Sequence, residues 1–93
     1  MFDIQLKDGV VVISGRLDAS QADRAERMLI HIQQSAVADL AALDYISSAG
    51  ISVLVKAQQR LMADGHALKL VNLQPRVRDV FHYASLEKVF GIE

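Results

Sequence analysis

Residues 43–54 read LDYISSAGISVL and contain the change of pattern on which the fold prediction depends. Two hydroxyl residues, Ser47 and Ser48, are followed by Ala49 and Gly50, and apolar runs lie on both sides. Small hydroxyl residues beside a glycine usually form a surface turn, but these apolar flanks are typical of a protein core. We therefore expect the serines to form a short loop between a strand and a helix, at the edge of the core.

The residues after this loop predict a helix over 48–63. Apolar residues recur there every three or four positions, as on the buried side of an amphipathic helix. Gly65 can end the helix because glycine readily adopts the left-handed conformation. Lys56, Gln59 and Arg60 fall on the opposite side of the helix, and we expect them to face water.

The residues before the loop predict a hairpin, a helix and a strand. Polar and apolar residues alternate on both sides of Asp8-Gly9, a pair that strongly favours a two-residue hairpin turn. From Ser20 the apolar spacing changes to that of a helix, which Ser20 could cap. A short strand around Ala36–Leu40 is expected next.

The C-terminal third predicts a strand over Ala67–Val71, a helix that begins at Pro75, and a short strand or an extended tail at the end. The element order is therefore β-β-α-β-α-β-α-(β). This order indicates an α/β fold, with a mixed β-sheet of four to five strands, helices packed on it, and right-handed crossovers between the later, parallel strands. Residues 1–93 are expected to form a single domain.

The composition argues against several classes of function. Ten Lys and Arg residues against eleven Asp and Glu residues give a net charge of −1, so we expect no nucleic-acid binding. The absence of cysteine excludes disulfides and thiolate metal sites. No apolar run approaches the ~20 residues that span a bilayer, which predicts no membrane insertion and a cytoplasmic location. His31, His66 and His82 are scattered, so we expect no metal, no cofactor and no enzymatic activity.

Three roles are open for Ser47 and Ser48 on the residues alone. Either hydroxyl could cap the helix by accepting a hydrogen bond from a backbone N–H two or three residues further on. A catalytic nucleophile would need a nearby base, which the surrounding sequence does not offer. Phosphorylation is consistent with the physics, because the N–H groups at a helix N-terminus can bind phosphate oxygens.

The sequence resembles the STAS domain of bacterial anti-anti-sigma factors, also called anti-sigma factor antagonists, from about Val10 to Phe90. In this family the serine loop commonly reads Asp-Ser-Ser/Thr-Gly-Leu-Gly, and aligning it on Gly50 places the phosphorylated serine at Ser48. The family's acid then falls at Ser47 and its second Ser/Thr at Ala49. The resemblance is carried by GRLD (15–18), ADLAALDYISSAGISVLVKAQQRL (38–61) and ADGHALKLVNLQPRVRDVFHYASLEKVF (63–90).

The resemblance implies transcription regulation by partner switching. Unphosphorylated proteins of this kind bind an anti-sigma factor that is also a serine kinase with a GHKL-type ATPase fold. Phosphorylated proteins release it, and a PP2C-type phosphatase resets them. Ser48 would be the phosphorylated residue, with Ser47 as second choice, and Asp18 would contact a kinase arginine. The partner-binding residues would be Asp18, Ser47, Ser48, Ala49, Gly50 and Lys56, on a protein that is monomeric alone.

Two residues depart from the family pattern. Ser47 replaces the usual acid, which removes a negative charge beside the phosphorylation site, and Ser52 replaces the second glycine. The alternative function is an accessory STAS subunit of an ABC-type lipid transporter that docks on its ATPase. The serine loop of those subunits tends to read Asp-Thr-Gly-Gly, so the two serines favour the anti-sigma factor antagonist.

Overall fold

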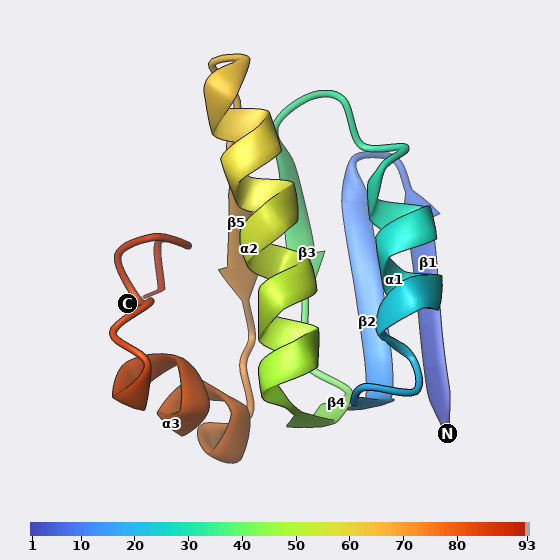
Figure 1. Cartoon of the computed structure of the whole chain (residues 1–93), viewed down its shortest axis with the longest axis vertical. Coiled ribbons are helices and arrows are strands. Elements are labelled where there is room, and N and C mark those ends of the chain that lie inside the picture. Colours follow the sequence, from blue (N-terminus) through green and yellow to red (C-terminus); the bar gives the residue numbers. More distant parts are fainter. Residues whose placement is uncertain (93) are drawn as a thin grey trace.

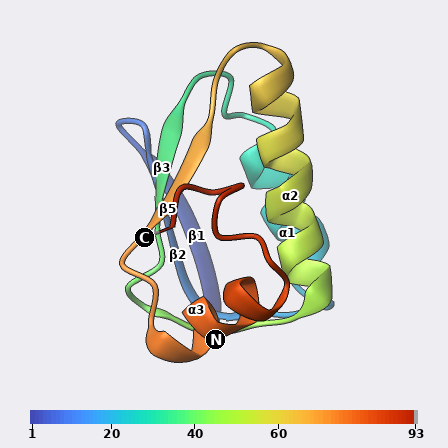
Figure 2. The same cartoon turned by 90° about the vertical axis from the view of Figure 1, so that its left-hand side faces the viewer.

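The computed structural model describes residues 1–92 and shows a five-stranded mixed β-sheet with helices α1 and α2 on one face (Figures 1 and 2). Helix α3 lies at one end of the sheet, beside β4. None of the helices in these residues is long and apolar enough to cross a membrane. The elements are β1 (Phe2–Lys7), β2 (Val10–Leu17), α1 (Ala22–Leu29), β3 (Ala36–Asp39), β4 (Leu43–Ile46), α2 (Ser48–Ala63), β5 (Leu68–Val71) and α3 (Pro75–Tyr83).

The hairpin predicted at Asp8-Gly9 is confirmed. Strands β1 and β2 pair antiparallel, with Lys7 opposite Val10. Asp8 and Gly9 both have positive φ angles, 52° and 79°. Two consecutive left-handed residues form the turn that matches the twist of the flanking strands, which fixes the register of the pair.

Strand β2 is the centre of the sheet because it pairs with three other strands. Its first half, from Val10, pairs with β3, and its second half, from Gly15 to Leu17, pairs with β4, in both cases parallel. The register shifts between Gly15 and Arg16, and Gly15 donates a hydrogen bond to Ala42 O at 2.9 Å. Two short strands therefore follow one another along the same side of β2.

The predicted mixed sheet of four to five strands with helices packed on it is confirmed, but the predicted order of elements is wrong in two places. The order is β-β-α-β-β-α-β-α, because β4 follows β3 before the helix. Only Leu43 and Ile46 of β4 are buried, so this strand lacks the alternation that indicates a strand. Residues 84–92 form turns in place of the short strand or extended tail.

The turns of residues 84–92 cover the outer edge of β5. Leu70 N–H donates to Phe90 O at 3.3 Å, and Phe90 is 1% exposed. The ring of Phe90 meets that of Phe81 edge to face, with centroids 5.5 Å apart. A buried aromatic pair therefore holds the tail against α3 and β5.

Gln58 connects the same tail to helix α2. Its side chain is buried, donates to Val89 O at 2.5 Å and accepts from Leu68 N–H at 2.6 Å. Both ends of the amide are paired, so its burial leaves no polar atom unsatisfied. One side chain thus joins three segments that are far apart in the sequence.

Arg60 corrects the prediction that this side of α2 faces only water. Its guanidinium donates to Ile32 O at 2.8 Å and to Leu29 O at 2.9 Å. Leu29 is the last residue of α1 and Ile32 lies just beyond the helix, where C=O groups lack intrahelical partners. Arg60 therefore fastens the end of α1 to α2.

We expect Arg60→Ala to lower the free energy of unfolding by about 1.5–3 kcal/mol, because two charge-assisted hydrogen bonds are lost. Urea denaturation followed by circular dichroism measures this change. The matched control is Gln59→Ala, an exposed neighbour on the same helix, whose effect should stay within about 0.5 kcal/mol. Equal effects of the two substitutions would contradict this role for Arg60.

Candidate functional site

Ser47 is the N-cap of α2. Its backbone is extended, with φ −94° and ψ 173°, and its Oγ accepts from Gly50 N–H at 3.3 Å. Its own N–H donates to Leu17 O at 2.9 Å, and its carbonyl accepts from Ile51 N–H at 2.9 Å. Of the two serines that could cap the helix, Ser47 does so, and its hydroxyl is occupied by this role.

Ser48 is the first residue of α2 and is exposed to solvent. Within residues 1–92 its hydroxyl makes no hydrogen bond to another residue. The backbone N–H groups of a first helical turn carry a partial positive charge and point toward solvent at this end. Ser48 therefore presents a free hydroxyl at a position that tolerates negative charge.

Gly50 is buried where the first turn of α2 meets the end of β2. A Cβ at this position would lie 2.7 Å from Leu17 O, 2.8 Å from Leu17 Cγ and 2.9 Å from Ile46 Cγ1. A real Cβ cannot approach that closely without displacing its neighbours. Gly50 supports the predicted site by allowing the serine loop to lie directly on β2, while the neighbouring Ala49 is half-buried.

Asp18 lies beside the serine loop. Leu17 and Ile46 are paired in parallel strands, so the residues that follow them, Asp18 and Ser47, leave the sheet at the same edge. The carboxyl ends of parallel strands are where open α/β sheets commonly bind ligands and partners. The structure therefore brings together Asp18, Ser47, Ser48 and Gly50, four of the residues that the family resemblance names as partner-binding.

The Asp18 carboxylate is held by Ser20. Asp18 Oδ1 accepts from Ser20 Oγ at 2.6 Å and from Ser20 N–H at 3.0 Å. The hydrogen bond from the Ser20 hydroxyl is the main cause that lowers the pKa of Asp18 below its ordinary 3.8. Asp18 is thus ionised at neutral pH.

The predicted capping role of Ser20 is wrong, because Gln21 is the N-cap residue of α1 and no side chain caps that helix.

Arg16 and Tyr45 form a stacked pair next to this site that the sequence did not indicate. They are opposite each other in the β2–β4 register, and the Arg16 guanidinium lies 4.2 Å from the centroid of the Tyr45 ring. Tyr45 and Ile46 belong to an apolar flank of the serine loop, which the sequence indicates to be part of the core. Ile46 is buried, whereas Tyr45 is 39% exposed and lies on the other face of β4. The sequence offered one signal for this pair: the alternation of β2 places the Arg16 side chain on the face of the sheet opposite the buried Leu17.

Lys56 lies further along α2. Eight residues separate it from Ser48, about 12 Å along a helix, and both belong to the exposed side of α2 that also contains Ser52. Its Nζ is 3.6 Å from Glu26 Oε1 of α1, and both side chains are largely solvent-accessible. Such exposed ion pairs contribute little to stability. Lys56 is therefore on the same surface as Ser48 but outside the serine loop.

The serine loop and its neighbours present polar groups at the surface. Within the part of the chain that the structure describes, no three His, Asp or Glu side chains are grouped so as to hold a metal ion. Ser48 has no general base hydrogen-bonded to its hydroxyl in those residues, so nothing there activates it as a nucleophile. A free hydroxyl, an ionised carboxylate and an Arg–Tyr pair are the groups presented.

The chain belongs to the STAS domain family, whose family model matches residues 1–93. Among curated proteins it is 36% identical over 74 residues to a Bordetella bronchiseptica protein named "Putative anti-sigma factor antagonist BtrV". That match covers 80% of this chain and 58% of the relative, so the chain spans less than two thirds of the curated relative's length. The resemblance seen in the sequence is confirmed at the level of the family.

Two solved structures support the same assignment. An anti-sigma factor antagonist from Mycobacterium paratuberculosis is 25% identical, with a TM-score of 0.78 over 97% of this chain and 81% of that one. The Bacillus cell fate determinant SpoIIAA in its phosphorylated form is 20% identical, with a TM-score of 0.71 over 95% of this chain and 86% of that one. At 20% identity, the likeness to SpoIIAA shows only that the two chains share a fold.

We expect Gly50→Ala to lower the free energy of unfolding by about 1–3 kcal/mol, because the added methyl overpacks the contact with Leu17 and Ile46. Ser52→Ala, on the exposed side of the next turn, is the matched control and should change it by less than about 0.5 kcal/mol. Thermal and urea unfolding measure both values. A Gly50→Ala protein as stable as the control would show that the close approach to β2 is not required.

Proposed function

We propose that this protein is an anti-sigma factor antagonist that works by partner switching in the cytoplasm. Unphosphorylated, it binds an anti-sigma factor that is also a serine kinase. Phosphorylation of Ser48 releases the kinase, and a PP2C-type phosphatase restores the binding form. The protein itself acts as a binding module and catalyses no reaction. The names of its Bordetella and Mycobacterium relatives support this function.

The observation that carries the proposal is the difference between the two serines. Ser47 caps α2 through its hydroxyl, whereas Ser48 is exposed and its hydroxyl makes no hydrogen bond within residues 1–92. A kinase needs a hydroxyl that can enter its active site without breaking the fold. Ser48 satisfies this condition, and Ser47 would have to give up its cap.

The release step is electrostatic. A phosphate adds about −1.5 to −2 charges at neutral pH, at the same edge of the sheet as the ionised Asp18 carboxylate. The N–H groups of the first turn of α2 can bind its oxygens, so the helix itself tolerates the change. A partner surface that accommodates a neutral hydroxyl beside Asp18 would have to desolvate this charge. That SpoIIAA has been solved in a phosphorylated form supports modification of a protein with this fold.

Asp18 and Lys56 extend the proposed contact surface beyond the loop. Only Oδ1 of Asp18 is used by Ser20, so within the described residues Oδ2 makes no hydrogen bond and can pair with a cation of the kinase. Lys56 lies on the same exposed side of α2 as Ser48. Because Ser47 replaces the family's acid, Asp18 is the carboxylate that remains at the loop.

The phosphorylation site is tested by incubating the protein with the GHKL-type kinase encoded nearest to its gene, together with ATP, and mapping phosphate by mass spectrometry. We expect Ser48→Ala to abolish phosphorylation. The matched control is Ser47→Asn, which keeps a good N-cap but removes the other hydroxyl, and it should be phosphorylated like the wild type. Phosphate that persists at the same level in Ser48→Ala would overturn the assignment.

The charge mechanism is tested with two substitutions of nearly the same size. Ser48→Asp should weaken binding to the same kinase, measured by calorimetry without ATP, by ~10²-fold, which corresponds to ~3 kcal/mol. Ser48→Asn carries no charge and should weaken it by less than ~10-fold. Equal affinities of the two variants would contradict release by charge, even if Ser48 proves to be the phosphorylated residue.

A further inference from the structure

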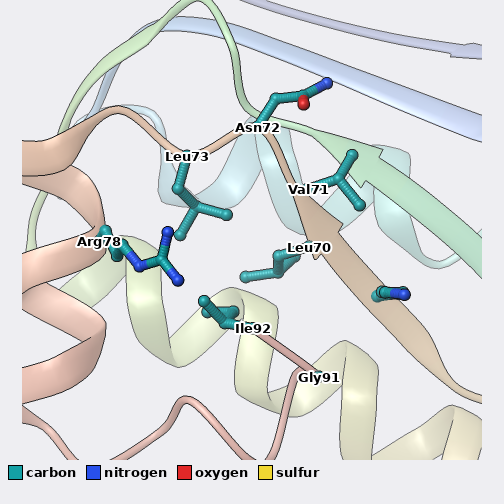
Figure 3. A pocket seen from close by; sticks show the side chains of 8 residues that line it. Leu70, Val71, Asn72, Leu73, Arg78, Gly91 and Ile92 are labelled. Atoms are coloured by element: carbon teal, nitrogen blue, oxygen red, sulfur yellow. The ribbon is translucent and has the colours of Figure 1, made fainter.

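A cavity of about 350 Å³ lies at the outer edge of β5, between that strand, α3 and the C-terminal turns (Figure 3). Its apolar lining comes from Leu70, Leu73 and Ile92, and its charged lining from Lys69 and Arg78. It contains none of the residues of the serine loop. Its volume is at the lower end of the range for small-molecule sites.

Arg78 gives the cavity its positive charge. Its guanidinium extends toward Leu73 and Ile92, and the side chain is exposed to solvent (Figure 3). Within residues 1–92 neither Arg78 nor Lys69 forms an ion pair, and no Asp or Glu lines the cavity. Both cations are exposed, and the lining includes no carboxylate of the described residues.

The backbone adds a third donor at Asn72. Val71 O faces β3, because it accepts from Leu40 N–H at 3.0 Å. In a planar trans peptide the C=O and the following N–H point in opposite directions, so Asn72 N–H points away from β3, toward the edge where the cavity lies. This N–H makes no hydrogen bond within the described residues.

The groups that line the cavity favour an anion over a cation. Lys69, Arg78 and Asn72 N–H are all donors and offer no acceptor for a cation.

We propose that this cavity binds a small organic anion, with a carboxylate or phosphate head on a short apolar body. The head receives hydrogen bonds from Arg78, Lys69 and Asn72 N–H, and the apolar body lies on Leu73 and Ile92. This proposal does not rest on the phosphorylation of Ser48. The cavity contains none of the serine-loop residues, so the two functions can fail separately.

The experiment is a titration of the ¹⁵N-labelled full chain, followed by amide chemical shifts at constant ionic strength. The probes are phenyl phosphate and benzoate, which each combine an anionic head with an apolar body. Inorganic phosphate is added separately to test an anionic head without an apolar body. We expect saturable shifts centred on the Asn72 amide, with at least one organic anion binding more tightly than inorganic phosphate. If phenyl phosphate binds more tightly than benzoate, the cavity prefers a phosphate head, and the reverse order of affinities indicates a carboxylate head.

Arg78→Gln should weaken this binding by at least about tenfold, the effect of losing one charge-assisted hydrogen bond. The matched control is Arg76→Gln, which removes an exposed cation from the same helix but outside the cavity. Shifts that do not saturate, or that are equal in the two variants, would show only a response to ionic conditions and overturn the site. Phosphorylation of Ser48 should be unchanged in Arg78→Gln.

Discussion

The serine loop depends on the contact between the first turn of α2 and a single carbonyl of β2. Leu17 O accepts a hydrogen bond from Ser47 N–H at 2.9 Å and would lie 2.7 Å from a Cβ on residue 50. The loop can therefore settle on the strand only with glycine at that position. Once it does, Ser47 is placed as the cap, Ser48 is directed outward, and Asp18 leaves β2 beside them.

Features that follow from local chemistry could be predicted from the sequence. Asp8-Gly9 specified the hairpin turn, and α2 begins and ends where its apolar spacing and Gly65 indicated. Features that arise from contacts between distant segments could not be predicted from the sequence. Strand β4 shows little alternation in its sequence and forms because its four residues pair with the second half of β2. The Arg60 side chain is held by hydrogen bonds to carbonyls about thirty residues away in the sequence.

The candidate site shows the same division. The family resemblance names Asp18, Ser47, Ser48 and Gly50 as partner-binding residues, and the structure places these four residues at one loop. On the residues alone either serine could cap the helix, because both are good caps by composition. Only the backbone geometry assigns the cap to Ser47. Arg16 and Tyr45 were missed because their contact is created by the β2–β4 pairing.

The exchange of the family's acid for Ser47 is conservative for folding but not for electrostatics. Aspartate and serine are comparable N-caps, so the loop can keep its geometry with either residue. With serine, the unphosphorylated loop has one negative charge fewer beside Asp18. In the proposed switch, phosphate on Ser48 therefore makes a larger relative change in the charge of this surface. The groups that hold the loop in place, Leu17 O and Gly50, lie beneath it and need not move.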